Sequence, residues 1–350
     1  MRFTLTLIIF LMSTSVFAQN KANPDLSLNT LFTIRGGSEG NAADAEAANG
    51  FALQEAELRL TSNIDTYFRG DVILAVESED GEYVVEPEEV FIDTLQIPSV
   101  TLRLGKFYPY WGRSNQWHTH AQPFIDAPQT REAIFGEEGF NETGLAVSYL
   151  LPTPWYFEVV AQAFSAENTA VFGSDTQDDL AGVYFVKNLW DLSDSSTLEL
   201  DLGYASGKDV LFQSNDVYNA ALTYKKKYAD ARAFIWTAEY TQARKRFVED
   251  EDNPGTYLSN DGLSALSTWL QYQFQKRWWG QLRYEAVSNL DDSSVDDITK
   301  SSALVAFVPS EFSAIRLQYD NIDDPSADEA EQRVTLQLNL TMGAHPAHDY

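Results

Sequence analysis

The sequence contains no cysteine and only four histidines, and no long hydrophobic run follows its first residues. Disulfide bridges and thiolate metal sites are therefore excluded. After residue 18 no stretch approaches the roughly eighteen consecutive apolar residues of a transmembrane helix. The net charge of −28 disfavours a nucleic-acid partner and favours cations. Aromatic residues make up 13% of the chain, which argues against disorder.

The N-terminus has the pattern of a secretory signal peptide. Arg2 supplies a positive charge, residues 3–12 are mostly apolar, and Val16 and Ala18 place small residues before a cleavage site. We expect residues 1–18 to be the signal peptide and residues 19–350 the mature chain. A retained N-terminal anchor is the alternative, although the apolar run is too short to span a bilayer.

Apolar and polar residues alternate in segment after segment. In residues 334–342 every second residue is apolar and the residues between are Thr, Gln or Asn. Residues 266–274, 281–286, 198–202 and 315–320 repeat the pattern. A period of two sends the two sets of side chains to opposite faces of a strand. The segments are about ten residues long, which suits a tilted membrane crossing better than a soluble strand.

The connections between these segments alternate between short and long. Seven tight turns fall near residues 62, 97, 153, 194, 230, 277 and 309, several of them beside aromatic residues such as Trp155 and Trp278. Sixteen strands follow if eight longer loops join the other ends. Bacterial barrels have such short periplasmic turns, long outer loops and aromatic girdles. The longer loops are predicted at 37–50, 78–87, 112–139, 166–178, 206–215, 248–262, 290–300 and 321–331. The segment 84–96 is acidic and irregular.

The polar faces of these strands carry charges of both signs. Arginine facing lipid near the midplane costs about 2–4 kcal/mol, so these faces are expected to line a wet interior. Charged rings of this kind set ion preference, although mutual pairing that stiffens the wall is the alternative. The predicted interior residues are Glu55, Glu57, Arg59, Arg69, Asp71, Arg103, Glu199, Asp201, Glu239, Arg283, Glu285, Arg316 and Asp320.

The longest predicted loop, residues 112–139, is the third on the outer side. In general porins of sixteen strands the third loop folds into the barrel and narrows it. This loop is therefore our candidate for a pore constriction. Its charged candidates are Arg113, Arg131, Glu132, Glu137 and Glu138.

The four histidines fall into two tight pairs, one in the third loop and one near the C-terminus. Imidazole is a common ligand of zinc, copper and nickel, and two histidines two or three residues apart can share one ion. Hydrogen bonding within the loop, or an incidental place in the tail, is the other interpretation. The predicted ligands are His118, His120, His345, His348 and Asp126, with Glu137 and Asp349 as alternative acidic ligands.

Several motifs resemble one known family. They are Gly105-Lys106-Phe107, Trp111-Gly112-Arg113, His118-Thr119-His120-Ala121, Pro123-Phe124-Ile125-Asp126, Phe135-Gly136, the segment 150–155 and Gly343-Ala344-His345-Pro346-Ala347-His348. Together they resemble Gram-negative outer-membrane proteins labelled zinc-regulated TonB-dependent outer-membrane receptors. The resemblance covers about a fifth of the chain and implies a metal-responsive uptake protein. The mature chain is too short for a plug domain inside a large barrel, and no TonB box follows Gln19.

The sequence thus predicts an all-β protein, a transmembrane antiparallel up-and-down barrel of about sixteen strands in the cell outer membrane. The predicted function is a porin-like channel for small solutes, preferring cations and linked to zinc or another divalent metal as bound or transported ligand. No cofactor is required, and the scarcity of histidine argues against an enzyme. The alternatives are a TonB-dependent metal or siderophore receptor and a structural or adhesive barrel. Outer-membrane lipid and small solutes or cations are the expected partners, and a homotrimer is an open option.

Overall fold

The structure is a computed structural model that describes most of the chain between residues 24 and 343. The described ranges are 24–38, 49–79, 82–136, 138–168, 170–173, 179–209, 212, 214–244, 246–249, 257–260, 262–289, 297–327 and 329–343. The predicted signal peptide 1–18 and the tail residues 344–350 lie outside them. No helix among the described residues is long and apolar enough to cross a membrane.

Sixteen antiparallel strands form one closed barrel, as the alternation predicted. The first and last strands, β1 and β18, pair with each other from Ser27 opposite Gly343 to Gly37 opposite Arg333, and this pairing closes the ring. The barrel strands are β1 (Asp25–Gly37), β2 (Gly50–Asn63), β3 (Phe68–Glu79), β4 (Glu82–Thr94), β5 (Val100–Phe107), β6 (Glu142–Leu150), β7 (Tyr156–Phe164), β8 (Ala181–Ser193), β9 (Ser196–Lys208), β10 (Ser214–Lys227), β11 (Ala233–Ala243), β14 (Leu263–Gln275), β15 (Trp278–Asn289), β16 (Ile298–Ser310), β17 (Ser313–Asp323) and β18 (Glu331–Gly343).

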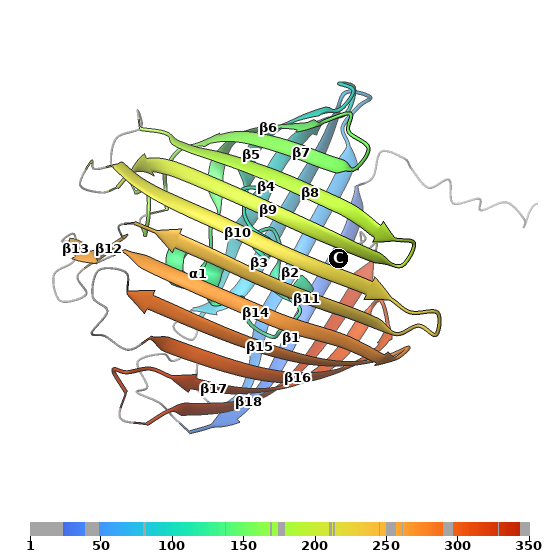
Figure 1. Cartoon of the computed structure of the whole chain (residues 1–350), viewed down its shortest axis with the longest axis vertical. Coiled ribbons are helices and arrows are strands. Elements are labelled where there is room, and N and C mark those ends of the chain that lie inside the picture. Colours follow the sequence, from blue (N-terminus) through green and yellow to red (C-terminus); the bar gives the residue numbers. More distant parts are fainter. Residues whose placement is uncertain are drawn as a thin grey trace, which may run out of the picture.

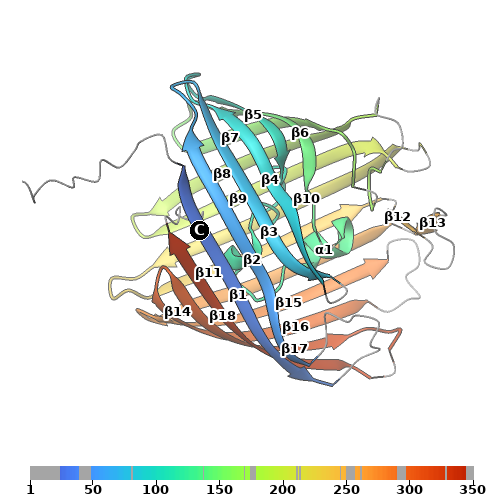
Figure 2. The ribbon, with the colours of Figure 1, turned by 180° about the vertical axis from the view of Figure 1, so that it is seen from behind.

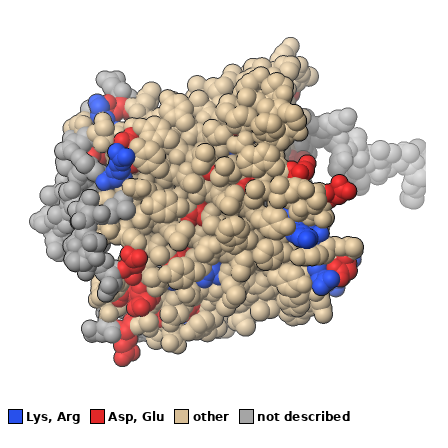
Figure 3. Space-filling view, in the orientation of Figure 1, with Lys and Arg blue, Asp and Glu red and all other residues tan. Residues whose placement is uncertain are grey.

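The alternation seen in the sequence is an alternation between outside and inside. On β18, Val334, Leu336 and Leu338 are exposed on the outer wall, whereas Thr335 and Gln337 are buried in the interior. Most of the wall in Figure 3 is free of charged side chains, and these gather toward the two ends of the barrel. An apolar wall with polar residues turned inward is the pattern that lipid requires of a spanning barrel.

The connections match the predicted asymmetry with two exceptions. The seven turns at one end have two to five residues each. The long loop predicted at 78–87 is wrong, because β3 extends to Glu79 and β4 begins at Glu82. Valines and a tyrosine at 83–85 favour extended backbone and continue the ladder there. The long loop predicted at 206–215 is also wrong, because β9 ends at Lys208 and β10 begins at Ser214, which leaves five residues between them. Near 248–262, β12 (Arg246–Glu249) and β13 (Tyr257–Asn260) form a separate two-stranded sheet.

The longest connection, residues 108–141 between β5 and β6, folds into the barrel. We call this segment the inner loop. It contains a turn of 3-10 helix (Thr119–Ala121) and the short helix α1 (Gln129–Phe135). Figures 1 and 2, seen from opposite sides, both place α1 among the strands and not outside them. The inner loop therefore occupies the place expected for a constriction.

Candidate functional site: the inner loop inside the barrel

The inner loop begins with a tight contact against β9 and β11. Gly112 has φ 55°, and a Cβ atom added there would lie 1.9 Å from Oε1 of Glu239. The same carboxylate accepts hydrogen bonds from the backbone N–H of Arg113 at 3.1 Å and the hydroxyl of Ser114 at 3.0 Å. Nη1 of Arg113 also donates to Glu199 at 2.9 Å. The glycine is thus needed both for its backbone conformation and for the close approach of Glu239.

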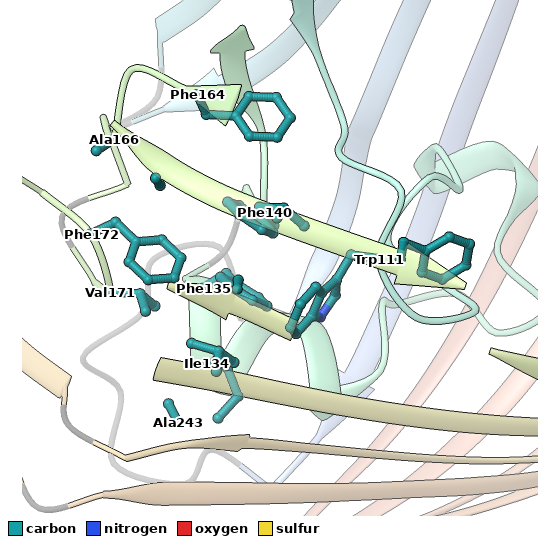
Figure 4. Close-up of a cluster of buried hydrophobic side chains, with 14 of the residues drawn as sticks. Trp111, Ile134, Phe135, Phe140, Phe164, Ala166, Val171, Phe172 and Ala243 are labelled. Atoms are coloured by element: carbon teal, nitrogen blue, oxygen red, sulfur yellow. The ribbon is translucent and has the colours of Figure 1, made fainter. Parts of the chain in front are cut away.

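Aromatic side chains hold the two ends of the inner loop against the wall. Trp111 lies edge-on to Phe135 and Phe140, with ring centroids 5.8 and 6.0 Å apart. Phe135 and Phe140 stack at 4.5 Å, and Phe140 also contacts Phe164 on β7. Figure 4 shows the rings of Trp111, Phe135 and Phe140 close to one another. Here the interior is apolar, so the polar lining predicted from the alternation is only part of the inner face.

The middle of the inner loop is fixed to the wall on β15–β17. Nη2 of Arg283 lies 2.6 Å from Oδ2 of Asp126, and Lys300 forms an ion pair with the same carboxylate. Oε1 of Glu285 accepts a hydrogen bond from the backbone N–H of Gln129 at 2.7 Å. The guanidinium of Arg283 also lies 4.5 Å from the ring centroid of Phe124. These contacts pin the segment before α1 to the wall.

Two further wall residues donate hydrogen bonds to the backbone around His120. Nη2 of Arg316 donates to the carbonyl oxygen of His120 at 3.2 Å, and Nη1 donates to that of Gln122 at 2.9 Å. The Nδ2 atom of Asn339 donates to the same carbonyl of His120 at 3.0 Å. The inner loop is therefore bound by side chains from β9 and β11, from β15–β17 and from β18, so it crosses the interior.

The two loop histidines face a group of buried and partly buried glutamates. Nδ1 of His118 lies 3.0 Å from Oε2 of Glu88, and its Nε2 lies 3.0 Å from Oε2 of Glu89. Nδ1 of His120 lies 3.0 Å from Oε2 of Glu57, which is also 3.3 Å from His118. The two imidazole rings are stacked with centroids 6.0 Å apart. The predicted pair is thus brought together, but with carboxylates of β2 and β4.

Two β-bulges aim these carboxylates inward. On β4, Ile73 of β3 pairs with Glu89 and Leu74 pairs with Pro87, so Glu88 is an extra residue. On β2, Leu31 pairs with Glu55 and Phe32 with Leu53, so Gln54 is extra. A bulge lets two consecutive side chains face the same side. Strict alternation of inward and outward residues does not predict that Glu88 and Glu89 both face inward. Only Pro87, a residue tolerated at bulges, indicates an irregularity in the strand.

Asp126 does not belong to the histidine group, so the prediction that it completes that site is wrong. Arg283 and Lys300 hold its carboxylate on the β15–β16 side, and Gln318 donates to it at 2.6 Å. Burial alone would raise the pKa of Asp126, but these two cations hold it well below its usual value. Asp126 is therefore an anchor of the inner loop.

Two other loop residues have altered pKa values. Burial lowers the pKa of His118, but the neighbouring Glu88 and Glu57 outweigh it and raise the pKa well above its ordinary value. Burial and the negative charge of Asp126 raise the pKa of Glu132 to about 7. His118 is consequently the cation of its group, and Glu132 changes charge near neutral pH.

The remaining predicted residues are in part paired with one another. Arg59 and Arg69 both contact Asp71, at 2.8 and 3.3 Å. Arg131 reaches the carbonyl oxygens of Trp117 and Glu138 within the inner loop. The other pairs are Arg103 with Asp93, Lys187 with Glu199 beside buried Asp201, and Asp320 with Ser302. The predicted Glu137, His345 and His348 lie outside the described residues, as does the alternative ligand Asp349.

Solved structures with the same architecture include an outer-membrane channel and an anion-selective porin. The DcaP channel of Acinetobacter baumannii matches with a TM-score of 0.62 and 11% identity, over 91% of this chain and 97% of DcaP. OmpF of Salmonella typhi matches with a TM-score of 0.61 and 13% identity, over 92% and 99%. The chain has the sixteen-stranded fold of porins. An anion-selective porin from Comamonas acidovorans shares this porin fold, with a TM-score of 0.57 and 11% identity over 91% and 98%.

Sequence comparison adds a relative without a known role. An uncharacterized protein of Aquifex aeolicus (strain VF5) is 27% identical, and the match covers 93% of this chain and 75% of the relative. No family model matches the chain. Within the porin fold, the described residues between 24 and 343 form no separate plug domain. The resemblance to TonB-dependent receptors therefore stays a prediction.

Proposed function

We propose that the protein is a passive outer-membrane channel for small hydrophilic solutes, with a preference for cations. The observation that carries the proposal is the inner loop, which crosses a closed barrel and is fixed by ion pairs such as Arg283–Asp126 and Arg113–Glu199. A loop held in this way narrows the interior at a defined height. Charged groups at a narrowing act on a passing ion more strongly than they would in open water.

The preference for cations is proposed from the charges of the side chains. The same fold occurs in an anion-selective porin from Comamonas acidovorans, so the fold alone does not decide the sign of the preferred ion. In this chain Glu55, Glu57, Glu88 and Glu89 face the inner loop, and no Lys or Arg of the described residues forms an ion pair with them. The chain as a whole carries a net charge of −28. Both features favour cations at the narrow part.

The apolar character of the outer wall supports a location in the outer membrane. Exposed apolar side chains such as Leu282, Leu317 and Val305 cover it at mid-height, and lipid is the solvent that such a surface requires. Trp155, Tyr156 and Trp278 are exposed near the short turns, where the girdle of a barrel belongs. A homotrimer stays a prediction that chemical crosslinking in native membranes can test.

Reconstitution into planar lipid bilayers tests this function. We expect stepwise conductance in symmetrical KCl and, under a KCl gradient, a reversal potential that shows K⁺ to be more permeant than Cl⁻. Glu89→Gln should move the reversal potential toward zero, whereas Asp230→Asn in an exposed turn should leave it unchanged. Insertion without conductance, or a reversal potential of the opposite sign, would overturn the proposal.

A further inference from the structure

Six ionisable side chains gather where the inner loop meets β2 and β4. Their ligand atoms form two overlapping sets, Glu55–Glu57–His120 and Glu57–Glu88–His118, and within each set the atoms lie within 4.8 Å of one another. Glu57 belongs to both sets. Glu89 contacts the other ring nitrogen of His118. The spacing is short enough for the atoms of one set to bind a common ion after small side-chain rotations.

The group is buried and carries more negative than positive charge. Glu55, Glu57 and His120 are 2%, 1% and 7% exposed, so water screens their charges poorly. Two imidazoles face four carboxylates, and the described residues supply no Lys or Arg within 4.0 Å of those carboxylates. Uncompensated charge in such a place is costly and is usually paired or bound to metal.

One atom of the group points to a missing ligand independently of the charge. Oε1 of Glu55 is buried and accepts no hydrogen bond from any residue that the structure describes. Oε2 of Glu57 differs from it, because Nδ1 of His120 lies 3.0 Å away and Nδ1 of His118 lies 3.3 Å away. Oε1 of Glu57 accepts a hydrogen bond from Asn29 at 3.2 Å. An unpartnered carboxylate oxygen is therefore buried on a member of the Glu55–Glu57–His120 set.

We propose that this group binds a divalent transition-metal ion, with Glu57 as the central ligand and His118, His120, Glu55 and Glu88 around it. The imidazole nitrogens favour zinc and its neighbours over calcium and magnesium, which take oxygen ligands. Asn29 on Glu57 and Tyr108 on Glu88, at 2.7 Å, orient the carboxylates as outer partners of a metal site do. The two bulges on β2 and β4 place the ligands.

This inference rests on the proposed function in one respect only, which is that the metal-binding group lies at the narrow part of a conducting pore. A cation bound there neutralises carboxylates at the narrow part, so zinc should reduce the preference for K⁺ over Cl⁻. Conductance measured without zinc tests the channel, and zinc titration tests the site. If the channel conducts but zinc neither binds nor changes its ion preference, the metal site is refuted and the channel is not. If the barrel binds zinc but does not conduct, the channel is refuted and the metal site is not.

The experiment is calorimetric titration of the folded barrel in detergent with ZnCl₂. His345→Ala/His348→Ala protein is the background, because it removes the tail imidazoles. We expect saturable binding there, and Glu57→Gln and His118→Ala/His120→Ala should each weaken it at least about tenfold. Asp201→Asn is the matched control, since it is also a buried interior carboxylate but lies outside both ligand sets; it should bind zinc as the background protein does.

Folding of each variant is checked by the shift of its band on heating before electrophoresis. Glu57→Gln keeps the size of the side chain, so we expect it to leave the barrel intact. If Glu57→Gln fails to fold, zinc binding is measured on His120→Ala alone. This variant should fold, because the backbone carbonyl of residue His120 still accepts its hydrogen bonds from Arg316 and Asn339. Equal titration curves for the background protein and either folded variant would overturn the proposal, as would an absence of zinc binding.

Discussion

The guanidinium of Arg283 on β15 binds the carboxylate of Asp126 in the inner loop, with Nη2 and Oδ2 2.6 Å apart. The side chain of Arg283 is almost fully buried, and its Nε atom also lies 2.9 Å from Oε2 of Glu285. One arginine thus links the wall to the middle of the longest loop. The strength of this link decides how firmly the loop is held across the interior.

Asp126→Asn should loosen the inner loop. The substitution leaves Lys300 without a carboxylate partner among the described residues, and breaking a buried ion pair costs on the order of 3 kcal/mol. We expect a lower free energy of unfolding in urea and larger, noisier single-channel currents. Asp230→Asn removes an exposed pair with Arg232 and serves as the control, with no change expected. Unaltered stability and current in Asp126→Asn would contradict the anchoring role.

Gly112→Ala should disturb the start of the inner loop. The added Cβ would meet Oε1 of Glu239 at 1.9 Å, and φ 55° is strained for alanine. We expect a loss of about 1–3 kcal/mol in the free energy of unfolding. Gly36→Ala is the control, because a Cβ at Gly36 has open space around it. The two variants are compared by urea titration in the same detergent, and equal midpoints would rule out the steric argument.

The stability of the barrel should depend on pH through Glu132 on α1. Its pKa is raised to about 7 in the folded protein, so there it binds a proton that the unfolded chain releases near 4.5. Its contribution to stability is therefore greatest at low pH, falls as the pH rises to about 7, and is constant above. Urea titrations at pH 5 and pH 8 measure this.

Glu132→Gln provides the comparison for that pH dependence. The variant should lose part of the decline between pH 5 and pH 8 and should be more stable than the wild type at pH 8, by on the order of 1–3 kcal/mol. Glu138→Gln, at an exposed position of the same loop, should retain the decline of the wild type. A Glu132→Gln curve parallel to that of the wild type would show that another group titrates.

Leu317→Arg should impair folding into lipid vesicles. Leu317 lies midway along β17 and is 50% exposed on the outer wall. Arginine at the bilayer midplane costs about 2–4 kcal/mol, and the cost falls to about 0–1 kcal/mol near the interface. Leu192→Arg, beside the turn at 194–195, should therefore cost less. Free energies of folding into phospholipid vesicles give the measurement, and equal costs would contradict the membrane position.

Many of the barrel strands could be predicted because the alternation of apolar and polar residues can be recognised within a short stretch of sequence. The alternation at 334–342 identified β18 and its two faces, and the polar turns at 194 and 230 identified hairpins. The acidic segment 84–96 was less clear, because the bulge at Glu88 interrupts the alternation. A bulge changes which face a residue takes without changing the composition of the strand.

Of the candidate metal-binding group, only the two histidines of the inner loop could be predicted from the sequence. His118 and His120 stand out because histidine is rare in this chain. Their partners on β2 and β4 depend on how the ring closes and where the inner loop lies, and neither is encoded within a short window. The same reason explains Asp126: its chemistry suggested a metal ligand, but the loop path places it against Arg283 and Lys300.

The pairing of β1 with β18 joins residues more than three hundred positions apart, such as Leu28 and Met342. Until the last strand is in place, both edges of the sheet expose backbone N–H and C=O groups that lipid cannot satisfy. A truncated chain that ends before β18 therefore has no stable place in a bilayer. Closure of the ring therefore depends on the C-terminal strand, which alone supplies the partner of β1 on that side.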